Sequence, residues 1–195
     1  MRRLRRIRLA QGALAALLVV LAAAALAGCG GGSPSDLVLP QDVEVTVRPS
    51  GAPGPHSVNL EYVGKSGREL TLQLSGVSLE GATGVAFEIR FDDALLEFVG
   101  SSPGTFFGAD AVTGAAVSEN DAALIVGVTA AADQSVGRGG SGTLITLRFR
   151  LRELRDAEDD LVFGTPQSQV YGPAGIAGQH TFTGAILTTR IQAPQ

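Results

Sequence analysis

Apolar and polar side chains alternate in three segments of the chain, residues 69–75, 84–91 and 143–152. Successive side chains of a β-strand point to opposite faces of the sheet, so a period of two residues predicts strands with one buried face. We expect the core to contain the apolar members of these segments, which are Leu70, Leu72, Leu74, Val85, Phe87, Ile89, Phe91, Ile145, Leu147 and Phe149.

Other segments are shorter or less regular but have the same character. Strands are expected at residues 57–63, 95–99, 122–130, 161–164, 168–171 and 181–191. Beyond residue 28 no segment keeps an apolar period of 3.6 residues for more than two turns, and the 26 glycines suit a chain rich in turns. The Gly-rich residues 137–142 precede a strand and are expected to form one of these turns. Eight or nine strands joined by turns predict an all-β protein built as a β-sandwich.

The first 29 residues have a different pattern. Five arginines fall within residues 2–8, and residues 12–26 are almost entirely Ala, Leu and Val, a run shorter than the roughly 20 residues of a membrane-spanning helix. The run ends in Leu-Ala-Gly-Cys at residues 26–29, which resembles the lipobox of bacterial lipoproteins at all four positions. The resemblance implies that residues 1–28 are a signal peptide and that the Cys29 thiol carries lipid. The alternatives are a plain signal peptide with an incidental cysteine and an N-terminal membrane helix.

Residues 29–56 are rich in Gly, Ser and Pro, a composition that favours a flexible tether between lipid and folded domain. Val43, Val45 and Val47 alternate with polar residues within it, which is compatible with a short strand at residues 43–48. The sequence therefore predicts a signal peptide over residues 1–28, a lipidated tether over residues 29–56 and the sandwich over residues 57–191.

Composition narrows the function once the predicted signal peptide is set aside. The remaining 167 of 195 residues suffice for one domain. They carry 10 basic and 19 acidic side chains, a balance opposite to that of most nucleic-acid-binding proteins, so nucleic acid is not expected as a partner. Cys29 is the only cysteine, so no disulfide forms within the chain and the fold depends on an apolar core.

No group of residues suggests catalysis. His56 and His180 have no Cys, His or carboxylate at metal-ligand spacing, and we expect both to be surface residues in loops. The chain has neither a Gly-x-Ser-x-Gly motif nor a phosphate-binding loop. We therefore expect neither an enzyme nor a bound cofactor.

Charged clusters have simple interpretations. Acidic residues gather at Asp92-Asp93 and at residues 158–160, and such groups usually bond their own backbone in turns or are solvated. Calcium takes several oxygen ligands, so a calcium site at either cluster stays open, although the ordered loop Asp-x-Asp-x-Asp-Gly is absent. Arg148, Arg150 and Arg152 share one face of a predicted strand, where we expect them to pair with acids of neighbouring strands and to protect a sheet edge.

Three segments together resemble the cohesin family. They are residues 69–77 (Glu-Leu-Thr-Leu-Gln-Leu-Ser-Gly-Val), residues 84–99, where Gly-Val-Ala-Phe-Glu-Ile-Arg-Phe-Asp precedes Leu-Glu-Phe, and residues 142–151 (Gly-Thr-Leu-Ile-Thr-Leu-Arg-Phe-Arg-Leu). The resemblance covers residues 57–191 and implies a nine-stranded jelly-roll sandwich, a fold shared with some carbohydrate-binding modules. It also implies binding of a dockerin, a small calcium-dependent module of another protein. The dockerin-binding sheet would correspond here to residues 84–91, 112–118, 122–130 and 161–171.

The alternation also defines a candidate binding face. If Phe87 and Ile89 are buried, their neighbours must point outward, and the same argument applies to residues 122–130. The candidate face consists of Ala86, Glu88, Arg90, Ala123, Ile125, Gly127 and Thr129. An exposed Ile125 flanked by Glu88 and Arg90 would give an apolar centre with a charged rim, as in many protein interfaces. The alternative is that loops cover this strand on both sides, which would make Ile125 part of the core.

These observations favour a non-catalytic protein-binding module, anchored by lipid at the cell envelope, whose partner is a dockerin-bearing protein. One alternative is a carbohydrate-binding module that binds polysaccharide, although no Trp and only Tyr62 and Tyr171 are available to stack on sugars. A second is a structural envelope lipoprotein. Gly30, rather than the Asp that tends to retain lipoproteins in an inner membrane, follows Cys29, which favours the outer membrane where the source has one.

Overall fold

The computed structural model describes residues 42–118, 122–131 and 136–192, and these residues form thirteen β-strands and no helix. The predicted signal peptide and Cys29 lie outside the described residues. In the described part, no helix is long and apolar enough to cross a membrane. The strands are β1 (Val43–Pro49), β2 (Ser57–Ser66), β3 (Glu69–Ala82), β4 (Gly84–Arg90), β5 (Leu96–Pro103), β6 (Val112–Ser118), β7 (Ala123–Thr129), β8 (Arg138–Leu151), β9 (Ala157–Phe163), β10 (Gln169–Gly172), β11 (Gly175–Ile176), β12 (Thr181–Thr183) and β13 (Ala185–Ile191).

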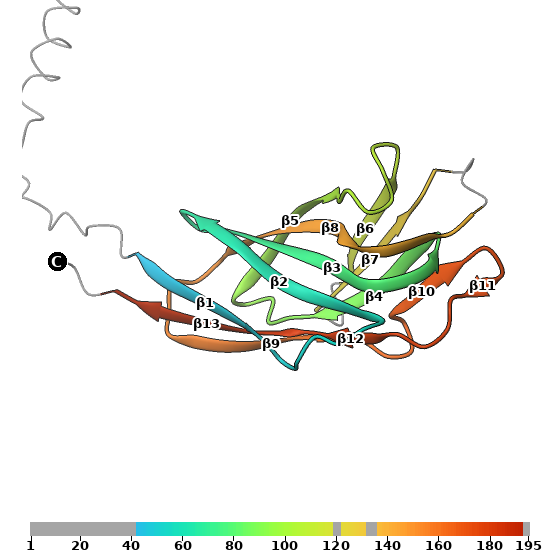
Figure 1. Cartoon of the computed structure of the whole chain (residues 1–195). Coiled ribbons are helices and arrows are strands. Elements are labelled where there is room, and N and C mark those ends of the chain that lie inside the picture. The colour runs from blue at the N-terminus through green and yellow to red at the C-terminus, as the bar shows by residue number, and fades with distance from the viewer. Residues whose placement is uncertain (1–41, 119–121, 132–135, 193–195) are drawn as a thin grey trace, which may run out of the picture. The chain divides into compact units, whose positions relative to one another are not determined.

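The strands form two sheets that enclose one apolar core (Figure 1). The large sheet has the order β1-β13-β9-β4-β10-β11, and β7 and then β6 continue it from β4. The small sheet has the order β12-β2-β3-β8-β5. Neighbours are antiparallel except for β12 and β2, which are parallel. The predicted all-β sandwich is therefore confirmed.

The core consists of the alternating apolar side chains of both sheets. All ten residues predicted for it are buried, with exposed fractions of 6% or less. The Phe87 ring meets Phe163 edge-on with centroids 5.9 Å apart, and Phe91 meets Phe149 of the small sheet at 5.4 Å. Such edge-to-face pairs add to the stabilisation that burial of the rings provides. The period of two residues therefore identified the buried face of β3, β4 and β8 correctly.

The sandwich begins earlier than the predicted boundary at residue 57. β1 pairs with β13 along its whole length, from Val43 opposite Ile191 to Pro49 opposite Ala185. Val43 is fully buried, and Val45 and Val47 pack against the core. The possible strand at residues 43–48 is thus confirmed as β1, and the sandwich begins there rather than at residue 57, because the alternating valines pack against the core.

The predicted last strand, residues 181–191, is two strands in different sheets. β12 pairs with β2 in the small sheet, and β13 pairs with β1 and β9 in the large sheet. The chain crosses between the sheets at Gly184, where an added Cβ would lie 2.1 Å from the Leu161 carbonyl oxygen. Only glycine fits at this approach. This split, together with the additional strands β1, β6 and β11, raises the number of strands from the predicted nine to thirteen.

The Gly-rich residues 137–142 are not the expected turn, because residues 138–142 form the first part of β8. There Gly140 lies opposite Leu79 of β3, and Arg138 lies opposite Ala82, with shifts of register between these pairs. An added Cβ at Gly137 would lie 2.0 Å from the Gly81 carbonyl oxygen. Here glycine permits close approach of the two backbones, which sequence inspection cannot distinguish from a turn.

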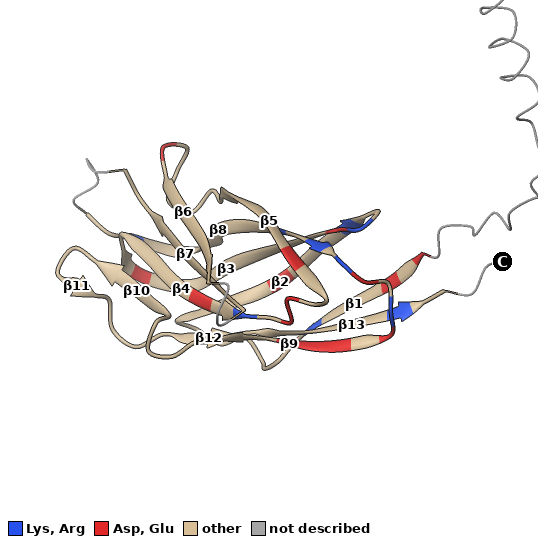
Figure 2. Ribbon diagram, turned by 180° about the vertical axis from the view of Figure 1, so that it is seen from behind, with Lys and Arg blue, Asp and Glu red and all other residues tan. Residues whose placement is uncertain are grey.

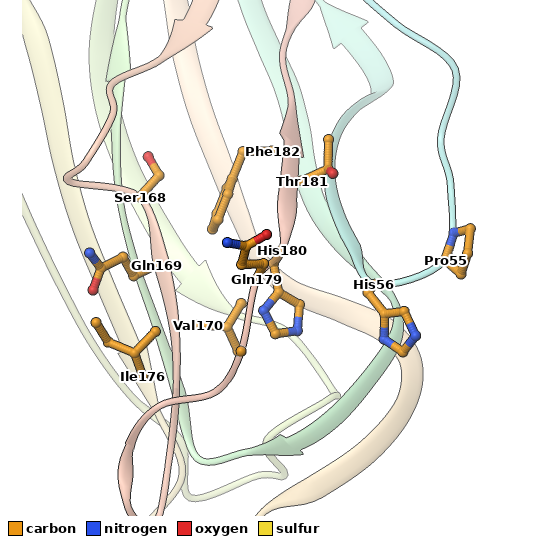
Figure 3. Close-up of a pocket in the computed structure, with 11 residues that line it drawn as sticks. Pro55, His56, Ser168, Gln169, Val170, Ile176, Gln179, His180, Thr181 and Phe182 are labelled. Atoms are coloured by element: carbon orange, nitrogen blue, oxygen red, sulfur yellow. The ribbon is translucent and has the colours of Figure 1, made fainter.

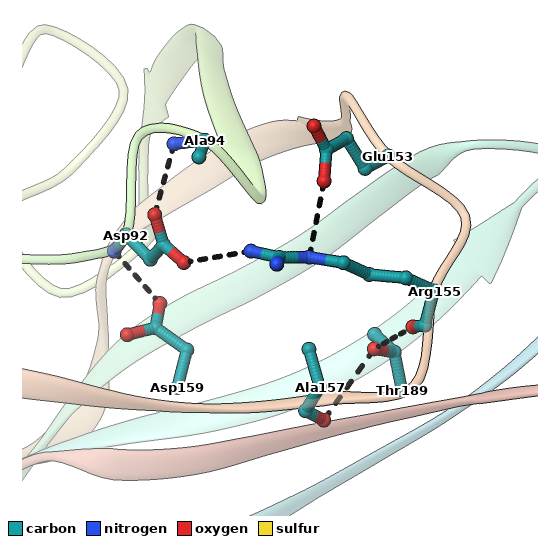
Figure 4. A network of polar contacts seen from close by, with 7 residues as sticks. All are labelled: Asp92, Ala94, Glu153, Arg155, Ala157, Asp159 and Thr189. Carbon is teal, nitrogen blue, oxygen red and sulfur yellow. Dashed lines mark hydrogen bonds and ion pairs between the residues drawn. The ribbon is translucent and has the colours of Figure 1, made fainter.

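The two acidic clusters meet at the turn between β4 and β5 (Figure 4). The Asp92 N–H donates to Asp159 Oδ2 at 3.0 Å, and Asp92 Oδ1 accepts the N–H of Ala94 at 2.9 Å. The Arg155 guanidinium forms two ion pairs, one with the Asp92 carboxylate at 3.2 Å and one with the Glu153 carboxylate at 3.1 Å. This network ties the turn to β9 and supplies a cation to Asp92 from within the chain.

The acidic residues 158–160 lie inside β9 instead of forming a uniformly solvated run. Glu158 and Asp160 are exposed, whereas Asp159 points to the other side and is half-buried. Burial raises the pKa of the Asp159 carboxyl, and the charges of Asp92 and Asp160 act in the same direction, against the hydrogen bond from the Asp92 N–H. Within the described ranges no three His, Cys, Asp or Glu side chains are grouped so that they could hold a metal ion.

Phe87→Ala should lower the free energy of unfolding by about 3–5 kcal/mol, because it removes a fully buried ring and leaves a cavity between the sheets. Denaturant unfolding of the purified protein measures the change. The control is Ile125→Ala on the exposed side of the same sheet, which should cost less than about 1 kcal/mol. Equal losses for the two variants would contradict the assignment of inner and outer faces.

Asp159→Asn should raise the free energy of unfolding at neutral pH. The folded-state pKa of Asp159 lies above its ordinary value of 3.8, so the ionised carboxylate destabilises the folded state above the raised pKa. The penalty disappears below pH 3.8, where folded and unfolded states are both protonated. Asparagine keeps an oxygen that can accept the Asp92 N–H.

Urea unfolding across the acid range tests this pH dependence. The advantage of Asp159→Asn over the wild type should shrink as the pH falls towards 3.8. Asp160→Asn, at the exposed neighbouring position, controls for the loss of one negative charge. The same pH dependence in both variants would refute a penalty caused by burial of Asp159.

Candidate functional site

The outward side of β10, β4, β7 and β6, here called the outer face, is a grid of directly opposed residues. Residues opposite each other in antiparallel strands share one face, so the pairing defines rows across the sheet. Successive rows contain Tyr171, Gly84, Thr129 and Val112; then Gln169, Ala86, Gly127 and Gly114; then Glu88, Ile125 and Ala116; then Arg90, Ala123 and Ser118. The outer face therefore joins segments that lie far apart in the sequence.

Small residues hollow the centre of the outer face. In the second row Ala86 is the only side chain on β4, β7 and β6, because Gly127 and Gly114 lie beside it. A shallow groove of about 420 Å³ follows this row, and Val112, Thr129 and Tyr171 form part of its wall. Most residues that line the groove are Val, Ala or Gly. A partner that covers the sheet would contact them.

Ile125 projects from the centre of this face with 52% of its surface exposed. The alternative in which loops bury Ile125 on both sides is therefore wrong. Arg90 and Thr129 are also exposed and Ala86 is half-buried, all on the outward side as predicted. Neither β6 nor β7 contains a charged residue, and Figure 2 shows both strands free of acidic and basic positions.

Glu88 differs from the prediction of an exposed rim charge, because it is only 9% exposed. The connection from β9 to β10 covers it. The Gly164 N–H donates to the Glu88 carbonyl at 2.9 Å, and the Glu88 N–H donates to Ser168 Oγ at 3.3 Å. Its carboxylate is paired with Arg90 Nε at 2.9 Å. Glu88 thus positions Arg90 and anchors a loop, which alternation within β4 could not reveal.

Ala123 is also a correction, since it lies on the outward side of β7 but is only 2% exposed. It is directly opposite Arg90 on one side and Ser118 on the other. Its burial is therefore not set by the alternation of β7 alone. The exposed part of the candidate face is therefore centred on Ile125 and extends towards β6, away from Ala123.

β6 and Tyr171 contribute to the outer face, although neither was selected from the residues. Val112, Ala116 and Tyr171 are exposed on the same side as Ile125. The sequence Val-Thr-Gly-Ala-Ala-Val-Ser of β6 has no clear alternation, and only the order of strands in cohesins pointed to residues 112–118. The signal for β6 was weak because the strand is exposed on both sides and is not patterned by a core.

A second cavity, of about 550 Å³, lies between the β10–β11 hairpin and the start of β12 (Figure 3). It brings together His56 and His180, whose ring centroids are 6.4 Å apart. The two meet because β12 pairs with β2, with the Thr181 N–H donating to the His56 carbonyl at 3.1 Å. Burial lowers the pKa of His180, and the neighbouring His56 lowers it further.

The polar groups of this cavity are imidazoles, hydroxyls and amides. The described residues that line it include no carboxylate that could orient either imidazole as a general base. Its other polar side chains are Ser168, Gln169, Gln179 and Thr181. Both histidines lie outside the strands, as predicted, and strand pairing in addition brings positions 56 and 180 together.

The arginine stripe lies on the small sheet and is separate from the outer face. Arg150 forms ion pairs with Glu69 of β3 at 3.5 Å and with Glu97 of β5 at 3.9 Å. Both acids are directly opposite it on the neighbouring strands. The expected pairing of the stripe with acids across strands is confirmed at Arg150, whereas the expected protection of a sheet edge is wrong, because β8 lies between β3 and β5.

Neither a family model nor a curated protein matches this sequence. Solved structures do match. A non-cellulosomal cohesin from the archaeon Archaeoglobus fulgidus is 16% identical with a TM-score of 0.53, and the match covers 68% of this chain and 89% of that one. A type II cohesin domain from the cellulosome of Acetivibrio cellulolyticus is 13% identical with a TM-score of 0.53, and the match covers 68% of this chain and 95% of that one.

A third similar structure contains a bound partner. It is the third cohesin of ScaC from Acetivibrio cellulolyticus in complex with the ScaB dockerin, with 12% identity, a TM-score of 0.55, and coverage of 66% of this chain and 95% of that one. At these low identities it is the structural similarity, with TM-scores of 0.53 to 0.55, that shows a shared fold, in agreement with the resemblance found in the sequence. The described part of this chain is accordingly a β-sandwich of the cohesin fold.

Proposed function

We propose that this chain is a non-catalytic protein-binding module that binds its partner through the outer face, and that the partner is a dockerin-bearing protein. The observation that carries the proposal is the exposed apolar centre of the outer face. Val112 is 61% exposed and Ile125 is 52% exposed on adjacent strands. Tyr171 lines the shallow groove of the outer face together with Val112.

The character of this surface favours protein binding. An antiparallel sheet with one solvated face usually carries polar residues there. β6 and β7 instead offer Val112, Ala116 and Ile125 around two glycines, while the pair of Arg90 and Glu88 marks one border. An uncharged apolar centre with polar surroundings is the usual anatomy of a protein interface.

The solved relatives suggest the class of partner. Several of the similar cohesin structures contain a dockerin, among them the ScaC cohesin with the ScaB dockerin and the sixth cohesin of scaffoldin B with the Cel5 dockerin. A module of the same fold with an exposed apolar sheet face fits this mode of assembly. Carbohydrate binding has less support, because Tyr62 and Tyr171 lie in strands of different sheets and cannot form one stacking platform.

The proposed site of action is the cell envelope. The lipobox-like residues 26–29 support lipid attachment at Cys29, and the sandwich begins at Val43. The 13 intervening residues could span at most about 45 Å at full extension. Such a tether would let the outer face meet proteins near the membrane surface.

Ile125→Asp should weaken dockerin binding at least tenfold, because it places an unpaired charge in the centre of the interface. Titration calorimetry with a panel of purified dockerin modules measures the affinity. The matched control is Val63→Asp, which changes an exposed valine of the small sheet. A dockerin that binds wild type and both variants equally would show that the outer face is not the binding site, and a panel without any binder would contradict the proposed partner.

Cys29→Ser should abolish incorporation of labelled fatty acid and block processing by the lipoprotein peptidase, so that the chain that keeps residues 1–28 accumulates. The reason is that the Cys29 thiol is the proposed point of attachment of the lipid. Undiminished labelling of the variant would exclude Cys29 as the lipidation site. Mass spectrometry of the wild-type N-terminus provides an independent readout.

A further inference from the structure

The chain has only two histidines, and both lie at the same end of the sandwich. His56 precedes β2 and His180 precedes β12, and each lies one residue before a directly paired position, Ser57 and Thr181. Because neighbouring strands are about 4.8 Å apart, the parallel pairing of β2 with β12 holds the two backbones close together. The topology of the small sheet is therefore what brings the histidines together.

The two imidazoles share the cavity of about 550 Å³ and lie next to each other in it. Their ring centroids are 6.4 Å apart, and the ring planes meet at 74°. In Figure 3 each ring has a nitrogen on the side of the other ring. Two nitrogen ligands are thus available at one place, with room beside them for an ion and its bound water.

His180 has a ring nitrogen without a protein partner. Its Nδ1 is buried and forms no hydrogen bond with any described residue. Buried polar atoms are nearly always satisfied, so an exception indicates a bound water or ion. None of the described residues that line the cavity is a carboxylate, so the imidazoles are its strongest metal ligands.

His56 has an unusual backbone conformation. Its φ of 54° lies in the left-handed region, which residues other than glycine seldom adopt. Such conformations persist only where the surrounding structure holds them, and they collect at ligand-binding positions. Here the Thr181 N–H donates to the His56 carbonyl at 3.1 Å and fixes the backbone. The His56 side chain remains exposed, so its imidazole can turn towards His180.

We propose that His56 and His180 together bind a divalent transition-metal ion such as Zn²⁺. A zinc–nitrogen bond is about 2 Å long, so two imidazoles on one tetrahedral ion have ring centroids about 5 Å apart. The observed 6.4 Å is about 1.4 Å longer, a difference that a turn of the exposed His56 side chain can close. Water and the hydroxyl and amide oxygens that line the cavity supply the remaining ligands.

The donor set favours a transition metal over calcium or magnesium. Imidazole nitrogen suits Zn²⁺, Cu²⁺ and Ni²⁺, whereas Ca²⁺ and Mg²⁺ take oxygen ligands, chiefly carboxylates. Outside the predicted signal peptide the chain carries 19 acidic and 10 basic residues, and this excess of negative charge attracts cations. With two protein side chains as its main ligands the ion keeps exchangeable positions, unlike a structural zinc with four protein ligands.

The metal site is separate from the proposed dockerin-binding surface. No described residue lines both the cavity and the shallow groove of the outer face. A bound ion would join the start of β2 to the start of β12. It would stabilise the folded chain, because the unfolded chain does not hold the two histidines together. Metal binding here does not depend on dockerin binding.

Titration of the full chain with Zn²⁺, followed by NMR of the imidazole nitrogens, tests the site. A chain produced without a histidine tag has only these two imidazoles, so their signals are unambiguous. Both should shift with the same apparent dissociation constant, and Ca²⁺ at equal concentration should shift neither. A saturable shift of one imidazole alone, or of neither, would overturn the proposal.

Substitutions identify the ligands independently. His56→Asn, which suits a left-handed backbone, and His180→Gln should each weaken Zn²⁺ binding at least about tenfold in calorimetry, once circular dichroism has shown an intact fold. The control Asp93→Asn removes an exposed acid far along the chain from either histidine and should leave the affinity unchanged. Cys29 is present in every variant, so metal bound by its thiol gives a common background. Undiminished Zn²⁺ affinity in both histidine variants would contradict the assignment.

Discussion

Burial of alternating apolar side chains between two sheets is the constraint on which the rest of this structure depends. The single cysteine precludes an internal disulfide, so the sandwich is held by rows such as Leu70, Leu72 and Leu74 packed against Val85, Phe87 and Ile89. Because the side-chain period of a strand is two, a shift by one residue would expose the whole set. The register of each sheet is therefore strongly specified.

The same constraint produces the outer face. Once Phe87 and Ile89 are buried, Ala86 and Arg90 must point outward, and the pairing of β4 with β7 and β6 places Ile125, Gly127 and Gly114 beside them. The surface feature proposed to bind a partner is thus the reverse side of the core packing. At the end of the sheet, where β6 has no outer neighbour among the described strands, both of its faces are open.

Strands patterned by the core could be predicted from the sequence, and features set by contacts between distant segments could not. The residues of β3, β4 and β8 alternate and were placed on the correct faces. Glu88 is buried by the connection after β9, and Ala123 is buried on the outward side of β7, and neither burial leaves a local signal in the sequence. The break at Gly184 within residues 181–191 was missed and residues 137–142 were predicted as a turn, because glycine serves close backbone approach as well as turns.

The central claim is that the outer face, rather than the small sheet or the histidine cavity, binds a partner. Backbone amide chemical-shift mapping during titration with a binding dockerin tests it most directly. The account predicts that the largest changes fall in β4, β6, β7 and β10, with Ile125 and Ala116 among them. Changes centred on β2, β3 and β8, or on His56 and His180, would contradict it.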